Sequence, residues 1–152
     1  MKIAIGSDER TKLTDVVIEE VEKRGHTVLR CGPLDDQAAC WPDVALQAAE
    51  AVVSEAVQEG ILFCWTGTGI SLAANKVPGV RAVLCGDAET ARGARLWNKA
   101  NVLCFSLRAT SEAVALEVLE AWFSTEYVPN DVDEACLLQV EEIERKYSKV
   151  SG

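Results

Sequence analysis

The sequence predicts a Rossmann-like α/β fold, with three layers (α/β/α) built around a five-stranded parallel sheet. Short apolar runs alternate with amphipathic stretches along the whole chain, which is typical of a parallel sheet covered by helices on both faces. The length of 152 residues suits one compact domain, and 49% hydrophobic with 26% charged residues is an ordinary globular composition. We therefore expect residues 1–152 to form a single domain.

Each of the five short apolar runs is expected to be a strand. These runs cover residues 2–6, 27–31, 61–64, 81–85 and 101–105. Between the first two, Leu13, Val17 and Val21 recur at i, i+4 and i+8, which places them on one helix face, and Gly25 ends that helix.

The second helix is expected to begin at Pro42, which suits a first helical turn, and to run through an alanine-rich stretch to about residue 59. Residues 32–40 before it are predicted to be a polar loop. After the third strand, a glycine-rich turn at residues 65–69 opens a short helix that ends near Ala74.

The last three helices also have recognisable beginnings. Asp87 is a plausible N-cap for a helix that reaches Trp97, and Ser111 is one for the next helix. The final helix follows Pro129 and is expected at about residues 131–148.

The charge balance of the chain disfavours some partners. There are 15 basic and 24 acidic residues, which gives a net charge of −9. Such a surface repels polyanions, so we expect no nucleic-acid partner and no membrane partner. No apolar run approaches the roughly 20 residues that span a bilayer, and the N-terminus does not have the pattern of a signal peptide. We therefore expect a cytoplasmic protein.

The histidine and cysteine content limits the possible chemistry. The one histidine, His26, precedes the amino end of a predicted strand, so serine–histidine hydrolysis and histidine-ligated metals are disfavoured. The six cysteines are widely spaced and form no CxxC pair, so no metal site is expected. In a reducing compartment they should remain free thiols.

In sheets of this type, ligands bind beyond the carboxyl ends of the strands, near the switch in strand order. The residues that this rule selects are Ser7 and Asp8, Cys64 to Ser71, Gly86 and Asp87, and Ser106. Asp8 can bind a substrate hydroxyl or cap the next helix. Glu9 and Arg10 can pair with each other, face solvent or contact a ligand.

The strongest local signal is the segment CWTGTGIS at residues 64–71. Its glycines let backbone amides approach a ligand, and the amides at a helix N-terminus can hold an anion or a developing oxyanion. Cys64 beside them can act as a base or nucleophile. The alternative is a tight turn with a buried cysteine. Nucleotide binding is disfavoured, because the segment has neither a third glycine nor a GK[ST] motif.

Two further groups of side chains allow both a functional and a structural interpretation. Three tryptophans near predicted loops or helix ends can stack on a sugar or pack at an interface: Trp41, Trp65 and Trp97. Three cations on or after the fourth helix can form a solvated face or attract an anion: Arg92, Arg95 and Lys99.

Nearly the whole chain resembles the ribose-5-phosphate isomerase B / galactose-6-phosphate isomerase family. The segments that carry the resemblance are KIAIGSD, RGHTV, WPDVA, GILFCWTGTGISLAANKVPGVRAVLC, ARGARLWNKANVLC and EVLEAWFSTEY. The resemblance implies aldose–ketose interconversion of a sugar phosphate through an enediolate, without metal or nucleotide cofactor. It also implies dimers or tetramers of dimers, in which the partner subunit completes the site and the last helix packs on that partner.

The resemblance also implies roles for individual residues. Cys64 would be the base, and Thr66 or Asp8 would move protons between the two substrate oxygens. Asn98 would contact the substrate. The amides that stabilise the enediolate would come from Gly67, Thr68, Gly69, Ile70 and Ser71.

The chain departs from the family at residues that the resemblance assigns to opening the sugar ring and to binding the phosphate. Glu9 stands where the family has a histidine, and Trp97-Asn98-Lys99 where it has His-Asn-Asp. Ala135 and Gln139 occupy the places of phosphate-binding arginines, and Trp65 that of a glycine.

Two accounts fit these departures. One is an isomerase whose substrate is open-chain, non-phosphorylated or carboxylated, with Arg10 or Lys99 supplying new anion contacts. The other is a catalytically silent subunit that binds a sugar-like ligand or has a structural role.

Overall fold

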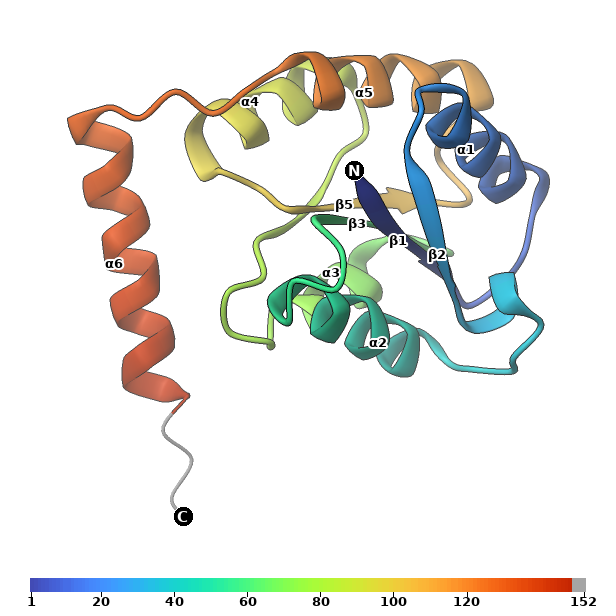
Figure 1. Ribbon diagram of the computed structural model, residues 1–152, viewed down its shortest axis with the longest axis horizontal. Coiled ribbons are helices and arrows are strands. Elements are labelled where there is room, and N and C mark those ends of the chain that lie inside the picture. Colours follow the sequence, from blue (N-terminus) through green and yellow to red (C-terminus); the bar gives the residue numbers. More distant parts are fainter. Residues whose placement is uncertain (149–152) are drawn as a thin grey trace.

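A five-stranded parallel sheet forms the middle layer of the computed structural model, which describes residues 1–148 (Figure 1). The strand order is β2-β1-β3-β5-β4, and every neighbouring pair is parallel. The strands are β1 (Lys2–Ser7), β2 (Thr27–Cys31), β3 (Glu59–Cys64), β4 (Ala82–Leu84) and β5 (Val102–Ser106). The predicted fold class is confirmed. Residues 149–152 of the predicted domain lie outside the described residues.

Five helices cover the two faces of the sheet, with α1, α4 and α5 on one face and α2 and α3 on the other (Figure 1). The helices are α1 (Lys12–Lys23), α2 (Trp41–Val53), α3 (Thr68–Ala74), α4 (Ala88–Asn98), α5 (Glu112–Ser124) and α6 (Asp131–Tyr147). The helices predicted in the sequence are all present, and the N-caps Asp87 and Ser111 each accept a hydrogen bond from a backbone N–H of the first turn.

The strands begin and end within two residues of their predicted bounds, and two larger differences occur around α2. Helix α2 ends at Val53 and not near residue 59, because Glu55 adopts a left-handed conformation with φ of 62° and the chain then turns into β3. The predicted loop at residues 32–40 contains a short 3-10 helix at Gly32–Asp35. Both differences arise from local turn geometry that apolar periodicity does not encode.

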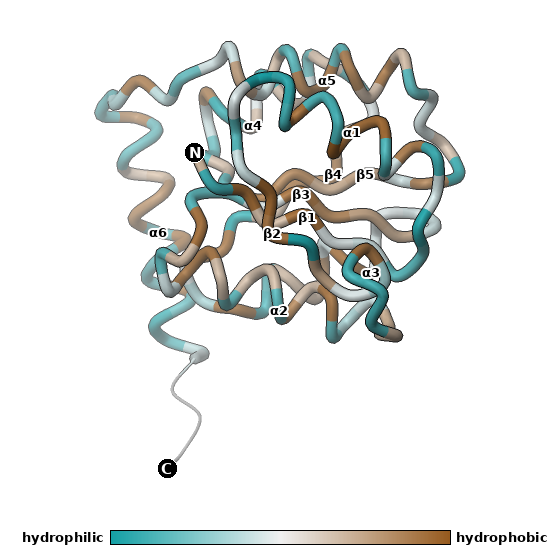
Figure 2. Tube along the Cα trace, turned by 45° about the vertical axis from the view of Figure 1, so that its right-hand side comes forward, coloured by the Kyte–Doolittle hydropathy of each residue, from teal (hydrophilic) through white to brown (hydrophobic). Residues whose placement is uncertain are grey.

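Alternate residues of the strands pack on opposite faces of the sheet. Ile61 and Phe63 of β3 join the core under α1, α4 and α5, whereas Leu62 and Cys64 join the core under α2 and α3. Both faces of the strands are therefore apolar, which explains the continuous apolar runs in the sequence (Figure 2). This alternation directs the Cys64 side chain toward the α2–α3 layer.

A buried ionic network joins the amino end of β3 to α4 and α5. Glu59 is buried, its carboxylate accepts a hydrogen bond from Trp122 Nε1 at 2.7 Å, and it forms an ion pair with Arg95 at 2.9 Å. The Arg95 guanidinium also lies 4.7 Å from the Trp122 ring centroid and donates to the Ala100 carbonyl at 2.8 Å. Arg95 therefore has a structural role and does not belong to a solvated face.

Replacing Glu59 by glutamine is expected to lower the free energy of unfolding by about 1–3 kcal/mol, because the amide leaves the partly buried Arg95 without its counter-ion. Urea denaturation would measure the change. Arg92→Gln is the matched control, because the Arg92–Glu89 ion pair is exposed and contributes at most about 0.5 kcal/mol. An equally small loss in Glu59→Gln would contradict the stabilising role of the network.

Helix α6 stands beside the three layers and has no buried residue (Figure 1). Within the described residues, two side-chain hydrogen bonds tie α6 to the segment before it and to the loop before β4. The Tyr127 hydroxyl donates to Glu134 at 2.6 Å, and the Gly79 N–H donates to the Glu144 carboxylate at 3.2 Å. Apolar side chains of α6 are left exposed, among them Val132, Leu138, Val140 and Ile143.

Candidate active site

The carboxyl ends of β1 and β3 form the point at which the strand order reverses. β2 lies on one side of β1, whereas β3 lies on the other side of β1 and is followed by β5 and β4. Ser7 is in register with Phe63, and Cys64 is in register with Ser106. The topology therefore places Asp8, Cys64 and the loop after Cys64 at the crevice where ligands bind in open α/β sheets.

Backbone contacts with the end of β5 hold the loop that follows Cys64. The Cys64 and Trp65 carbonyls accept hydrogen bonds from the N–H groups of Leu107 at 2.9 Å and Arg108 at 3.0 Å. The Ser106 hydroxyl donates to the Trp65 carbonyl at 3.0 Å. The Cys64 side chain is 5% exposed, so its thiol lies at a fixed and nearly dry position.

The glycine-rich turn leaves backbone donors free at the start of α3. Gly67 has φ of 74°, and the Thr66 and Thr68 hydroxyls share a hydrogen bond of 2.7 Å. The N–H of Ser71 donates to the Gly67 carbonyl, but no bond in the described part of the chain uses the N–H groups of residues 68–70. These three amides are therefore available to an oxygen of a ligand.

Asp8 is free to serve a ligand, because Thr11 caps the next helix. The Thr11 side chain accepts from the Thr14 N–H, which rules out the capping role that the sequence allowed for Asp8. Burial raises the pKa of Asp8 above the ordinary value of 3.8, its own backbone N–H opposes this, and the nearby Glu9 adds to the rise. Arg10 pairs with Asp15 at 3.0 Å and not with Glu9.

Replacing Asp8 by asparagine is expected not to lower stability at pH 7. Because the pKa of Asp8 is raised on folding, the wild type takes up a proton on folding just above pH 3.8 and loses stability as the pH rises through that range. Asparagine does not titrate, so the variant does not lose stability in this way as the pH rises. Denaturant unfolding at pH 4 and pH 7 would measure it, and a variant less stable than the wild type at pH 7 would contradict the expectation.

Two tryptophans border the loop. A Cβ atom placed on Gly69 would lie 3.3 Å from ring atoms Cδ2 and Cε3 of Trp41, so the indole of Trp41 packs directly on this glycine. Trp41 is 38% exposed, and Trp65, which follows Cys64, is 61% exposed. The loop is therefore flanked by aromatic surface that solvent can reach.

Arg108 was not among the site residues predicted from the sequence. The structure places it on a cavity of about 390 Å³ beside the loop, whose lining also includes Thr66, Gly86 and Ser106. A signal for it existed, because Arg108 follows the end of β5 by two residues and β5 neighbours β3. No ion pair involves Arg108 within residues 1–148.

The other predicted site residues lie at the opposite edge of the sheet. Helix α4 starts at the carboxyl edge and runs back over 11 residues, about 16 Å, so Trp97, Asn98 and Lys99 lie at the amino edge. Asn98 lines a second cavity of about 390 Å³, between the sheet edge and α6. One chain therefore does not bring these three residues to Cys64.

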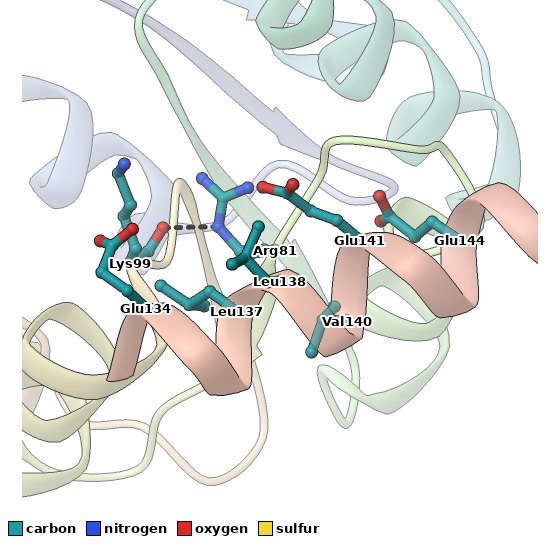
Figure 3. A pocket seen from close by; sticks show the side chains of 8 residues that line it. All are labelled: Arg81, Lys99, Glu134, Leu137, Leu138, Val140, Glu141 and Glu144. Carbon is teal, nitrogen blue, oxygen red and sulfur yellow. Dashed lines mark hydrogen bonds between the residues drawn. The ribbon is translucent and has the colours of Figure 1, made fainter. Parts of the chain in front are cut away.

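The surroundings of Lys99 are shown in Figure 3. Its carbonyl accepts a hydrogen bond from Arg81 Nε at 2.7 Å, and both residues face α6 across a groove that includes Glu134 and Glu141. Lys99 Nζ lies 5.2 Å from the Tyr127 ring centroid. His26 is remote from the loop, as predicted, and contacts the N-terminal amine and the Phe123 ring.

No cluster of histidine, cysteine or carboxylate side chains suited to a metal ion occurs within the described residues. The search of the same part of the chain found no helix long and apolar enough to cross a membrane.

Comparison with known proteins gives a consistent result. The ribose/galactose isomerase family matches residues 3–136. The chain is 37% identical over 127 residues to ribose-5-phosphate isomerase B of Escherichia coli, covering 83% of this chain and 85% of that protein. It is 33% identical over 144 residues to galactose-6-phosphate isomerase subunit LacB of Clostridium acetobutylicum, covering 94% and 83%. The solved structure of Clostridium thermocellum ribose-5-phosphate isomerase B superposes with a TM-score of 0.91 at 38% identity, covering 97% and 99%.

Proposed function

Because the chain belongs to the ribose/galactose isomerase family, we propose that it interconverts an aldose and a ketose through a cis-enediolate, with Cys64 as the proton-transferring base. The observation that carries this proposal is the position of Cys64. Its thiol is nearly buried at the switch point of the sheet, and the next helix presents three unused amides beside it. A thiol base next to preorganised oxyanion donors is what enolisation of a carbonyl compound requires.

The reaction follows from this arrangement. Cys64 removes the proton from C2 of the open-chain aldose, and electron density moves onto the C1 carbonyl oxygen. The amides of the loop at residues 66–71 stabilise the resulting enediolate. Thr66 or Asp8 transfers a proton from the C2 oxygen to the C1 oxygen, and Cys64 returns the carbon-bound proton to C1, which yields the ketose. No step needs a cofactor.

The second group of predicted residues would enter the site from a partner subunit. Asn98, Trp97 and Lys99 lie about 16 Å from the carboxyl edge along α4, so one chain cannot bring them to its own Cys64. An assembly in which the amino edge of one subunit meets the carboxyl edge of another would complete the site. The exposed apolar side chains of α6 support packing on such a partner, in a homodimer or a tetramer.

The substrate specificity is proposed to differ from that of ribose-5-phosphate isomerase B. Glu9 and Trp97 replace residues that the resemblance assigns to substrate handling, and Ala135 and Gln139 are uncharged. The same replacements also suit a catalytically silent sugar-binding subunit, which is the competing function.

Proton NMR in heavy water distinguishes an active isomerase from a catalytically silent sugar-binding subunit. The purified chain would be incubated with ribose 5-phosphate, ribose, galactose 6-phosphate and their ketoses. Deuterium at C2 of the aldose or C1 of the ketose, with interconversion, is the expected result for at least one pair. The absence of exchange with every sugar that the protein binds would overturn the proposed activity.

A further inference from the structure

Helix α3, which begins with the free amides of residues 68–70, is too short to hold its own position. It has seven residues, whereas isolated helices shorter than about 12–15 residues are marginal in water. Two of its side chains, Ile70 and Ala74, are buried in the apolar cluster between the sheet and α2. Apolar burial is not directional, so these contacts keep α3 on the sheet without fixing its place along its own axis.

The side chain of Asn75, at the end of α3, ties this helix to the sheet. Its Nδ2 donates to the Ala82 carbonyl at 2.8 Å, and its Oδ1 accepts from the Ala82 N–H at 2.8 Å. The Asn75 N–H also donates to the Ser71 carbonyl at 3.1 Å, so Asn75 belongs to the last turn of the helix. The two bonds to Ala82, here called the Asn75 clamp, pair the side chain with the outer edge of β4 as a residue of an antiparallel strand would.

The Asn75 clamp joins α3 to the same hydrogen-bonded sheet that carries Cys64. Ala82 is in register with Val102 of β5, and Cys64 is in register with Ser106 of the same strand. Displacement of α3 along its axis would break both bonds of the clamp, which limits the movement of its first amides relative to the Cys64 thiol. Misplacement of reacting groups by about 1 Å can cost about 100-fold in rate.

We infer that Asn75 is a positioning residue for the proposed reaction, because it fixes the first amides of α3 relative to Cys64. The inference rests on the proposed function, which gives those amides their role as oxyanion donors. Asn75 acts through the helix and not on the substrate, since it lies at the opposite end of α3, about 10 Å along the axis from the first turn.

Asn101 provides a matched control, because it ties the same loop to the start of β5 and not to α3. Its Oδ1 accepts from the Arg81 N–H at 2.7 Å, and its Nδ2 donates to the Gly79 carbonyl at 2.9 Å. Each asparagine therefore makes two side-chain bonds to the backbone of residues 79–82, but only Asn75 belongs to the end of α3. A general loosening of this loop would affect both alanine variants alike.

Kinetics of Asn75→Ala and Asn101→Ala test the inference. The substrate is the aldose that the wild type turns over fastest among ribose 5-phosphate, ribose and galactose 6-phosphate, at a temperature where both variants are folded. Asn75→Ala should lower kcat by about 10- to 100-fold and change KM by less than about threefold, because the amides act mainly in the transition state. Asn101→Ala should keep kcat within about twofold. An unchanged kcat in Asn75→Ala, or an equal loss in Asn101→Ala, would overturn the inference.

Hydrogen exchange of the α3 amides, followed by NMR, tests the Asn75 clamp without turnover. Without the clamp α3 should open locally, so the amides of residues 71–74 should exchange at least about tenfold faster in Asn75→Ala than in the wild type. In Asn101→Ala they should exchange at the wild-type rate. Unchanged exchange in Asn75→Ala would overturn the inference.

Asn75→Asp replaces Asn75→Ala in both experiments if the alanine variant does not fold. Aspartate keeps an acceptor for the Ala82 N–H but puts a carboxylate oxygen against the Ala82 carbonyl, where the asparagine has a donor. It should therefore also speed exchange in α3 and lower kcat. Wild-type values of both quantities in Asn75→Asp would contradict the inference.

The proposed activity and the inference fail in different ways. If the wild type isomerises a sugar and Asn75→Ala keeps its kcat, the isomerase proposal stands and the inference fails. If α3 exchanges faster in Asn75→Ala but the wild type exchanges no proton on any sugar, the isomerase proposal fails and the positioning of α3 by Asn75 stands.

Discussion

Replacing Cys64 by alanine is expected to lower kcat for isomerisation by about 10²- to 10⁴-fold, the range for loss of a general acid–base group. The thiol is nearly buried at the switch point, directly before the glycine-rich turn that opens α3. Sugar binding should persist, because alanine leaves the loop and the neighbouring Asp8 in place. Deuterium exchange at C2, followed by NMR, measures the loss, and calorimetry measures the binding.

Cys104→Ala is the matched control for Cys64. Cys104 lies on the neighbouring strand β5, in the same apolar cluster, and is completely buried. Burial raises the pKa of its thiol, so Cys104 remains neutral and cannot act as a base. Its replacement should lower stability slightly and leave kcat within about twofold. A Cys64→Ala protein that kept the activity of this control would contradict the assignment of the base.

Replacing Gly67 by alanine is expected to damage both stability and catalysis. Gly67 has φ of 74°, and an added Cβ would lie 2.4 Å from Leu84 Cδ1 and 2.9 Å from the Phe105 carbonyl. The leucine tip can move, but the backbone of β5 cannot. We expect the free energy of unfolding to fall by about 2–4 kcal/mol, from the left-handed conformation and the steric overlap. Displacement of one oxyanion donor should lower kcat by about 10²- to 10³-fold.

Gly86→Ala provides the comparison for stability. Gly86 also lies at the carboxyl edge, but no heavy atom lies within 4 Å of the position of its Cβ and its φ is not left-handed. Its replacement should change the free energy of unfolding by no more than about 0.5 kcal/mol. If Gly67→Ala lost stability but kept full kcat at a temperature where it is folded, the loop amides would not be the oxyanion donors.

The sequence predicted the fold well because both faces of the sheet are buried. Each strand is then a continuous apolar run, as at β3, and each helix has the spacing seen in Leu13, Val17 and Val21. The ends of elements that depend on turn geometry were harder to predict from the sequence. The end of α2 is decided by the left-handed Glu55, a residue type with no preference for that conformation.

The candidate site was only partly predictable. The rule that ligands bind at the carboxyl ends of strands selected Asp8 and the loop after Cys64, because that rule depends only on the order of strands and helices. Family resemblance added Asn98, but the tertiary structure shows that α4 carries it to the other edge of the sheet. The distance between two residues depends on helix length and direction, which a motif does not state.

The sequence by itself determined the α/β class, the family resemblance and the identity of the cysteine beside the glycine-rich loop, since these follow from local pattern and residue type. Only the tertiary structure decided which side chains are free to act. Thr11 caps α1 in place of Asp8, and Arg10 forms an ion pair with Asp15. Arg95 forms an ion pair with Glu59, and the Trp41 ring packs on Gly69. Each of these outcomes depends on partners that come together only when the layers pack. A single sequence does not encode them in local spacing.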